Sequence, residues 1–176
     1  KIKGYLDKSF PLDDWQVTAC LGHFRDLPDD ETAVNPQNWS DLKWQETTKG
    51  KKVIKELRKI CKEVDKVYLA TDPDREGEAI AWHVSDLLKT KYAKKIEGKE
   101  IKRAVFYEIS KNAVKKAITE PREIAMDLVE SQETRRALDR HFGFSLSPLL
   151  WRLFPSNNHS AGRVQSPALR MIVERE

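Results

Sequence analysis

Carboxylate side chains are concentrated in one short stretch of the chain, T-D-P-D-R-E-G-E, which begins at Thr71. Four of its residues are acidic, and they occupy positions 72, 74, 76 and 78. Because carboxylates this close repel one another, such a cluster is costly unless a cation neutralises it. Mg²⁺ prefers oxygen ligands and needs only one or two protein carboxylates, since it keeps several waters. We therefore interpret Asp72, Asp74 and Glu76 as a magnesium site.

The segments on either side separate this interpretation from the alternative, a solvated acidic turn that merely caps a helix. Residues 66–71 form a nearly continuous apolar run, typical of a strand buried on both faces. The pattern of residues 77–90 is helical. Ligands gather at the carboxyl ends of strands in open parallel sheets, so this setting favours the metal site. Glu78 is expected to favour the helix N-terminus electrostatically, and Arg75 is a candidate phosphate contact.

Two further strands are predicted to end at the same edge of the sheet. Residues 16–21 (Q-V-T-A-C-L) run into a glycine and His23, and residues 103–107 run into Glu108. In a parallel sheet these strand ends lie beside the acidic cluster. A histidine in a turn usually has no ligand, but this placement makes His23 a candidate substrate contact. Arg103, at the start of the second run, is a further candidate phosphate contact.

The carboxyl-terminal part is helical in pattern and rich in arginine. Residues 124–144 predict one long helix, on which Arg136 and Arg140 lie one turn apart on the same face. Farther on, S-A-G-R-V-Q-S at residues 160–166 places small residues, hydroxyls and an arginine just before a helix N-terminus, which suits a phosphate. The arginines alone fit a solvated face equally well. The small-residue loop beside them favours nucleic acid.

The alternation of strands and helices predicts an α/β fold with a parallel sheet. Residues 28–50 are polar and predict a long surface excursion with one short strand over residues 43–46. No strand signal follows residue 124, so we place a boundary there, between an α/β metal-binding domain (1–124) and a helical segment of a larger domain (125–176). Helices are expected over residues 51–64, 77–90, 110–119, 124–144 and 168–176, with Ser110 as a cap, Pro121 as a terminator and Pro167 at the last start.

Composition sets broad limits on what the protein is. The 176 residues carry a net charge of +4 and a pI of about 9.0, a mild excess that is compatible with nucleic acid but common among other proteins. Cys20 and Cys61 are isolated, which predicts reduced thiols rather than a disulfide or zinc site. No apolar run reaches the length of a membrane span, and no secretory signal opens the chain, so we expect a cytoplasmic protein with no membrane partner. The start at Lys1 reads like the inside of a helix, which suggests a piece of a longer chain.

Four stretches together resemble one family, the bacterial type IA DNA topoisomerases. The stretch A-T-D-P-D-R-E-G-E-A-I-A-W-H at residues 70–83 is similar to the Toprim metal motif of that family. The stretches G-H-F-R-D-L-P (22–28), V-F-Y-E-I (105–109) and S-A-G-R-V-Q-S (160–166) are similar to further parts of it, in the same order and spacing. The resemblance covers essentially the whole chain. The D-x-D alone is shared with primases, some nucleases and recombination proteins.

The resemblance implies a Toprim-type, Rossmann-like parallel sheet flanked by helices and followed by a smaller all-helical segment. It implies an enzyme that relaxes negatively supercoiled DNA without ATP, by cutting one strand through a 5′-phosphotyrosyl bond, passing a second strand and resealing. It also implies Mg²⁺ at Asp72, Asp74 and Glu76. The implied single-stranded DNA contacts are His23, Arg135, Arg136, Arg140, Ser145, Arg152, Ser160, Ala161, Gly162, Arg163, Val164 and Gln165, of which Arg135 and Ser145 are neighbours rather than central contacts.

Two departures from the family pattern limit what this chain does alone. The V-E-S-P-A-K-type opening of the family, with its active-site Glu and Lys, is absent, and so is the domain that bears the catalytic tyrosine. None of the chain's own tyrosines stands in the matching context, so we expect Mg²⁺ binding and weak DNA binding but no cleavage. We expect a monomer that works with the remaining domains of its parent, in the bacterial cytoplasm at the nucleoid.

Three other interpretations stay open at this level. One is another Toprim enzyme, a nuclease or primase-like protein that uses Asp72 and Asp74 for metal-assisted phosphodiester chemistry. Another is a phosphotransferase in which Asp72 itself is phosphorylated, although the E-G-E continuation fits that class poorly. The last is a non-enzymatic module that only binds nucleic acid.

Overall fold

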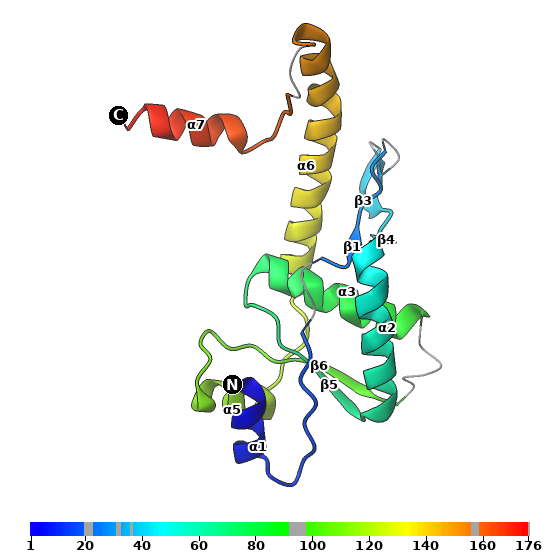
Figure 1. Ribbon diagram of the computed structural model, residues 1–176, viewed down its shortest axis with the longest axis vertical. Helices are drawn as coiled ribbons and strands as arrows, with labels where there is room; N and C mark the ends of the chain where they lie inside the picture. Colours follow the sequence, from blue (N-terminus) through cyan, green and yellow to red (C-terminus); the bar gives the residue numbers. More distant parts are fainter. Residues whose placement is uncertain (20–22, 31–32, 36, 92–97, 156–158, 176) are drawn as a thin grey trace. The chain divides into compact units, whose positions relative to one another are not determined.

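A computed structural model describes residues 1–19, 23–30, 33–35, 37–91, 98–155 and 159–175 as a mixed α/β protein (Figure 1). Its contacts divide the chain into two compact units. The first unit comprises Lys1–Asp26 and Glu46–Gln132, and the second comprises Leu27–Gln45 and Glu133–Glu176. Each unit is described by itself below.

A small parallel sheet lies in the first unit and confirms the predicted fold class. Strand β5 (Lys66–Leu69) pairs in parallel with β6 (Glu100–Arg103), and Leu69 lies opposite Arg103. The predicted strand over residues 103–107 is displaced, because β6 already ends at Arg103 and that residue next pairs with Arg122 in an antiparallel bridge. The prediction that β5 is buried on both faces is also wrong, since only Leu69 is buried in this strand.

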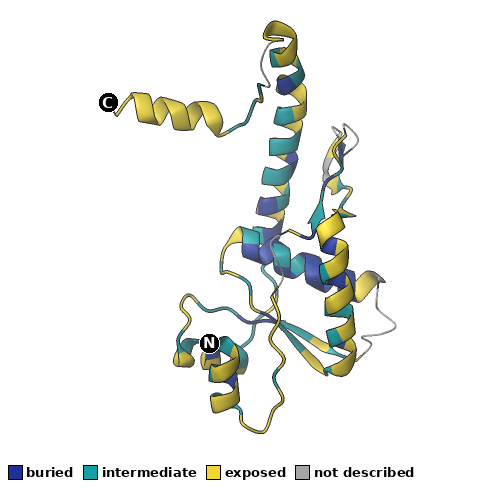
Figure 2. Cartoon of the chain, in the orientation of Figure 1, coloured by how far each residue is buried: buried dark blue, intermediate teal, exposed yellow. Residues whose placement is uncertain are grey.

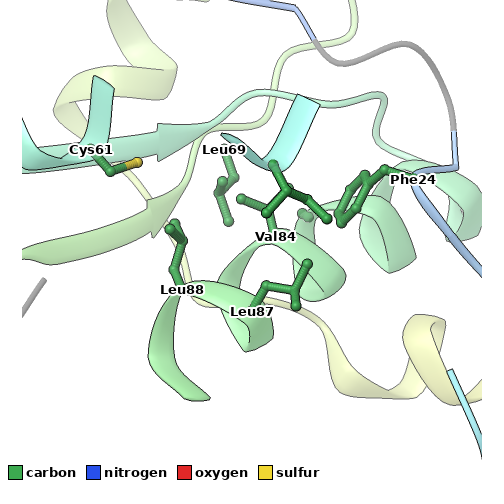
Figure 3. Packing of buried hydrophobic residues seen from close by; sticks show 8 residues of the cluster. Phe24, Cys61, Leu69, Val84, Leu87 and Leu88 are labelled. Atoms are coloured by element: carbon green, nitrogen blue, oxygen red, sulfur yellow. The ribbon is translucent and has the colours of Figure 1, made fainter. Parts of the chain in front are cut away.

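Helices pack around this sheet close to where their sequence patterns predict them. Helix α2 (Thr48–Glu63) starts slightly early because the Thr47 side chain caps it, accepting a hydrogen bond from the Gly50 N–H. Helix α3 (Arg75–Lys91) follows β5, and α5 (Lys111–Thr119) is capped by Ser110 as predicted. A shared core joins α2, β5 and α3, as Figure 3 shows. Its buried members are Phe24, Ile54, Cys61, Leu69, Ala81, Val84, Leu87 and Leu88.

The amino-terminal part of the first unit contains a helix but lacks the strand expected over residues 16–21. Helix α1 (Ile2–Ser9) is followed by an irregular segment, and residues 16–19 make no strand, whereas residues 20 and 21 lie outside the described part. Instead, Trp15 packs its ring 5.8 Å from the ring of Tyr68 on β5. Cys20 also lies outside the described residues. Cys61 is a buried free thiol, and burial raises its pKa against the opposing effect of Lys99.

The second unit contains a hairpin where the sequence predicts a polar surface excursion. Strand β2 (Val34–Asn35) pairs antiparallel with β3 (Asn38–Leu42). The hairpin buries Leu27, Ala33 and Val34 against Ala137 of helix α6 (Met126–Leu153). The short strand predicted over residues 43–46 is present as β4 (Gln45–Glu46), whereas the two-residue strand β1 (Arg25–Asp26) belongs to the first unit. The few apolar side chains of the hairpin form a small separate core. The sequence does not predict it, because most residues around them are polar.

The helix α6 is longer than its sequence pattern predicts. It continues beyond residue 144 and includes Pro148, whose ring nitrogen has no hydrogen to donate to the carbonyl one turn earlier. The final helix, α7 (Gln165–Val173), has no buried residue, and it is exposed along its whole length in Figure 2. It begins three residues before the predicted start.

The compact units divide the chain differently from the boundary that the sequence predicts at residue 124. The division falls within α6, between Gln132 and Glu133, and residues 27–45 belong with the second unit. Sequence patterns cannot show this, because the hairpin core depends on Ala137, about a hundred residues away. Within the described ranges, no helix combines the length and apolarity needed to cross a membrane.

A matched pair of glycines tests how closely α2 packs. A Cβ at Gly50 would lie 1.9 Å from the carbonyl oxygen of Phe24, whereas a Cβ at Gly4 in α1 would meet nothing within 4 Å. We expect Gly50→Ala to lower the free energy of unfolding by about 1–3 kcal/mol through overpacking, measured by urea denaturation. Gly4→Ala is the control and should stabilise by up to about 1 kcal/mol. Equal effects of both variants would contradict the close approach at Gly50.

Candidate functional site

An acidic turn joins the end of β5 to the start of α3. Asp72 and Asp74 are exposed in this turn, and Glu76 lies in the first turn of the helix. Asp74 Oδ1 accepts a hydrogen bond of 2.8 Å from the Gly77 N–H, and Thr71 Oγ1 donates one of 2.5 Å to the Gly77 carbonyl. The two bonds hold the turn through both the N–H and the carbonyl of the glycine.

Glycine is required at position 77 because helix and turn touch there. A Cβ on Gly77 would lie 2.1 Å from the carbonyl oxygen of Asp72 and 2.8 Å from its nitrogen. No real side chain accommodates such distances, so the helix start packs directly on the backbone of Asp72. This close approach fixes where the first carboxylate of the cluster begins.

Arg103, the last residue of β6, holds the same turn by hydrogen bonds to its backbone carbonyls. It is fully buried, and its Nη2 donates 2.7 Å to the Asp72 carbonyl while its Nη1 donates 2.8 Å to the Leu69 carbonyl. Its Nε donates 3.1 Å to Glu78 Oε2. The prediction that Arg103 contacts phosphate is therefore not supported, because the guanidinium is enclosed and its donors are engaged. Arg75, in contrast, is exposed.

Glu78 is the buried counter-charge of this network. Besides Arg103, it accepts two hydrogen bonds of 2.9 Å from the Arg122 guanidinium and one of 2.9 Å from the Ala125 N–H. Burial by itself would raise the pKa of Glu78, but Arg122, the Ala125 amide and Arg103 together hold it below its usual 4.5. Glu78 thus joins α3 to β6 and to the segment before α6. That is a larger part than the helix-terminus effect predicted for it.

Glu76 lies beside His23, although residues 16–19 do not form the strand from which the sequence predicts the place of this histidine. His23 Nε2 is 3.1 Å from Glu76 Oε2, and the Gln132 side-chain Nε2 donates 3.3 Å to the same oxygen. Glu108 takes a different part, since its Oε1 accepts a hydrogen bond of 2.7 Å from Ser110 Oγ at the start of α5. The edge therefore gathers one histidine and one amide around the acidic turn.

The donor set of the turn fits Mg²⁺ in its chemistry. Asp72, Asp74 and Glu76 offer only hard carboxylate oxygens, and Mg²⁺ needs one or two of them beside its waters. Within the described ranges, no three His, Cys, Asp or Glu side chains converge as a ready-made metal cage. The residues therefore suit a hydrated ion that binds on an open turn, rather than an ion enclosed by protein.

His83, the last residue of the motif over residues 70–83, lies inside the first unit. It is buried beside Phe24, and its Nδ1 lies 3.5 Å from Arg25 Nη1. Arg25 also donates 2.7 Å to Asp86 Oδ2. Burial first, and then the positive charges of Arg25 and His23, lower the pKa of His83 to about 3. His83 therefore stays neutral at ordinary pH and acts as a packing residue.

Among the predicted DNA-binding arginines of the second unit, Arg140 is paired with both an acidic and a carbonyl oxygen. Arg140 donates 2.7 Å to Asp29 Oδ1 and 2.8 Å to the Leu27 carbonyl, and its guanidinium lies 5.2 Å from the Phe144 ring centre. It thereby ties the hairpin to α6. Arg136 is half-buried, whereas Ser145 and Arg152 are exposed on α6.

The predicted phosphate loop lies along one stripe of α6. Asp139, Gly143, Ser147 and Trp151 follow one another every four residues, so they share a helix face. They contact the loop in reverse order. Asp139 Oδ1 accepts 2.6 Å from Arg163 Nε, Ser147 Oγ accepts 3.1 Å from the Ala161 N–H, and Trp151 Nε1 donates 2.5 Å to the His159 carbonyl.

Asp139, on α6, forms ion pairs with two arginines. Its Oδ2 also lies 3.6 Å from Arg135 Nε. The hydrogen bond from Arg163, the largest contribution, and the charges of both arginines lower the pKa of Asp139. Ser160, Val164 and Gln165 are exposed, and Ala161 and Gly162 are half-buried. The structure thus brings most of the predicted loop onto α6.

Comparisons with known proteins agree with this geometry. The Toprim domain profile matches residues 1–109, and that of DNA topoisomerase matches residues 123–176. DNA topoisomerase 1 of Xylella fastidiosa (strain Temecula1) is 51% identical over 99% of this chain and 20% of that protein. DNA topoisomerase 1 of Zymomonas mobilis is 48% identical over 99% of this chain and 14% of its own length. The full-length topoisomerase I of Thermotoga maritima matches with a TM-score of 0.77 at 38% identity, over 99% of this chain and 28% of that one.

The parallel sheet and acidic turn are therefore those of a Toprim domain. The chain belongs to the bacterial type IA DNA topoisomerase I family. It spans only 14–20% of the length of the two curated relatives named above.

Sequence reasoning missed three residues that shape these sites. Arg122 neutralises Glu78, Gln132 contacts Glu76, and Asp139 holds the loop arginine. Only Asp139 had a usable signal, because it lies four residues after Arg135 on a predicted helix. The partners of the other two are more than forty residues away in sequence.

The buried Glu78 network predicts a specific pH dependence of stability. Glu78→Gln should cost about 3–5 kcal/mol at neutral pH, because it leaves Arg103 without its buried counter-charge. The folded pKa of Glu78 is lowered, so the carboxylate stabilises fully above 4.5 and loses this effect as the pH falls through the folded value. The difference between parent and variant in urea denaturation should therefore shrink in acid. Glu120→Gln, an exposed control on an i,i+4 pair, should change little. A difference that is the same at all pH values would contradict the network.

Gly77 provides a test of the turn itself. We expect Gly77→Ala to displace the Asp72 backbone, because the added Cβ overlaps its carbonyl oxygen. Backbone amide NMR shifts should change over residues 71–77 and much less on α5, and the stability should fall by about 1–3 kcal/mol. Unchanged shifts in the turn would show that the helix start has room for a side chain.

Proposed function

We propose that this chain is the Toprim domain and adjoining helical segment of a longer type IA DNA topoisomerase, which relaxes negatively supercoiled DNA by Mg²⁺-dependent cleavage, strand passage and religation of one strand. The observation that carries the proposal is the acidic turn at the carboxyl end of a parallel strand, stapled around Gly77. The similarity of the whole chain to proteins named DNA topoisomerase 1 supports the same conclusion.

In this proposal Asp72, Asp74 and Glu76 hold Mg²⁺, which supplies positive charge near a DNA phosphate when it is bound. Thr71 and Gly77 fix the turn, and the Arg103–Glu78 pair supports it from inside. His23, beside Glu76, is placed to donate to a phosphate or sugar oxygen. Arg75, exposed at the first position of α3, is a further phosphate contact.

The second unit supplies the DNA-binding surface in this proposal. The Nε groups of Arg163 and Arg135 lie 2.6 and 3.6 Å from Asp139, and in this proposal the two guanidinium groups also contact a phosphate. Arg136, Arg140, Ser145 and Arg152 line the same helix, and the loop residues Ser160, Ala161, Gly162, Val164 and Gln165 present backbone and small side chains to a single strand. Non-specific binding to the phosphate backbone should weaken steeply with salt.

We further propose that the nucleophilic tyrosine and the family's opening glutamate and lysine lie in other parts of the parent protein. The chain alone then binds Mg²⁺ and single-stranded DNA weakly and forms no covalent adduct. The parent acts as a monomer on the nucleoid of a bacterial cell. A covalent DNA adduct on this chain alone would contradict the assignment of the nucleophile elsewhere.

The central experiment removes the two exposed aspartates. The double variant Asp72→Asn/Asp74→Asn is made in the parent protein. Its Mg²⁺-supported relaxation should fall by more than about 100-fold, because loss of a residue that only supports a metal ligand already costs about 10- to 100-fold. The measurement is relaxation of supercoiled plasmid across a MgCl₂ series. Asp65→Asn, at the opposite end of β5, is the matched control and should behave like the parent.

Two outcomes would replace the proposal with another function. Metal-dependent hydrolysis of DNA by the parent, without a protein–DNA adduct, would indicate a nuclease or primase-like Toprim enzyme. DNA binding that neither needs Mg²⁺ nor changes in the double variant, with no relaxation activity, would indicate a binding module.

A further inference from the structure

Glu76 differs from the two aspartates because its carboxylate is held by side chains from elsewhere in the fold. Its Oε2 has His23 Nε2 at 3.1 Å and Gln132 Nε2 at 3.3 Å. His23 comes from the segment before β1, and Gln132 comes from α6. Both lie in the same compact unit as Glu76.

Gln132 is the unusual member of this group. Its side chain is buried, yet its Oε1 is enclosed without a hydrogen-bond partner among the described residues. A buried amide that satisfies only one of its two ends is less stable than an apolar side chain of similar size would be. Packing alone therefore does not account for glutamine at this position. What the amide supplies is the hydrogen bond to Glu76.

The amide orientation follows from the same contact. If the oxygen and nitrogen were exchanged, the amide oxygen would face the Glu76 carboxylate, and two acceptors would oppose each other. With the nitrogen on Glu76, the oxygen is the end that stays unsatisfied, and it can accept only from a donor that is not part of the described protein. The contact with Glu76 therefore decides which way the amide lies.

We propose that Gln132 is a positioning residue for Glu76, which holds that carboxylate in the orientation needed at the acidic turn. This inference rests on the proposed metal site. It adds a residue of α6, outside the Toprim motif, to the determinants of cation binding.

The test measures Mg²⁺ binding and stability on the same protein. In this 176-residue chain, backbone amide NMR shifts of residues 71–77 are followed during titration with MgCl₂, and the midpoint of thermal unfolding is recorded without metal. We expect Gln132→Leu to weaken Mg²⁺ binding about tenfold, as for other outer partners of metal ligands. Its unfolding midpoint should be equal to or higher than that of the parent, because an unsatisfied buried oxygen is removed.

A matched variant separates positioning from simple loss of structure. Val129→Ala, a fully buried site one turn earlier on α6, should lower the unfolding midpoint and leave the Mg²⁺ affinity within about twofold. A purely structural role for Gln132 would instead lower the midpoint of Gln132→Leu and leave affinity unchanged. If Gln132→Leu does not fold, Gln132→Asn keeps the amide on a side chain one carbon shorter, and it should show the same loss of affinity.

The outcomes also distinguish this inference from the proposed function. If Asp72→Asn/Asp74→Asn abolishes the Mg²⁺-dependent shifts while Gln132→Leu and Gln132→Asn bind like the parent, the metal site stands and the role of Gln132 is wrong. If the double aspartate variant leaves the shifts unchanged, the metal site itself is wrong, and the inference about Gln132 falls with it.

Discussion

The buried ion pair between Arg103 and Glu78 is the constraint on which the first unit depends. Both side chains are fully enclosed, so each needs the other to offset the cost of losing water. Arg103 also donates hydrogen bonds to the carbonyls of Leu69, Asp72 and Ala104. Glu78 also accepts hydrogen bonds from Arg122 and from the Ala125 amide. One charge pair therefore fixes the ends of both parallel strands and the chain that leads into α6.

This arrangement separates the structural carboxylate of the acidic cluster from the two exposed ones. The structural carboxylate, Glu78, is buried and neutralised, whereas Asp72 and Asp74 are exposed, where water screens their repulsion. The backbone of the turn is held by Arg103 and by the close approach of Gly77. Asp74 Oδ1 also holds the turn through the Gly77 N–H, so the Asp72 carboxylate and the second oxygen of Asp74 remain available to a cation. Within seven residues of sequence, Glu78 therefore supports the fold, whereas the exposed carboxylates are the ones that can bind a cation.

In the second unit the candidate site residues are basic, and acidic side chains hold them in place. Its arginines are anchored by aspartates, with Asp139 on Arg163 and Asp29 on Arg140. A carboxylate that holds a guanidinium fixes its orientation, which reduces the entropy lost when a phosphate binds. The helix α6 serves both units, since it carries Gln132 at the end of one and these arginine sites in the other.

The sequence by itself determined the family, the α/β class, most helices, the cap at Ser110, and the acidic turn that follows a strand. These follow from rules that act over a few residues, such as helical periodicity, capping and the chemistry of D-x-D-x-E-G. Only the tertiary structure decided that Arg103 is a buried support rather than a phosphate contact. It alone showed that residues 27–45 build a core with Ala137 and that Gln132 contacts Glu76. In each of these cases the deciding partner lies 25 to more than 100 residues away, and packing chooses it, so no local pattern could have named it.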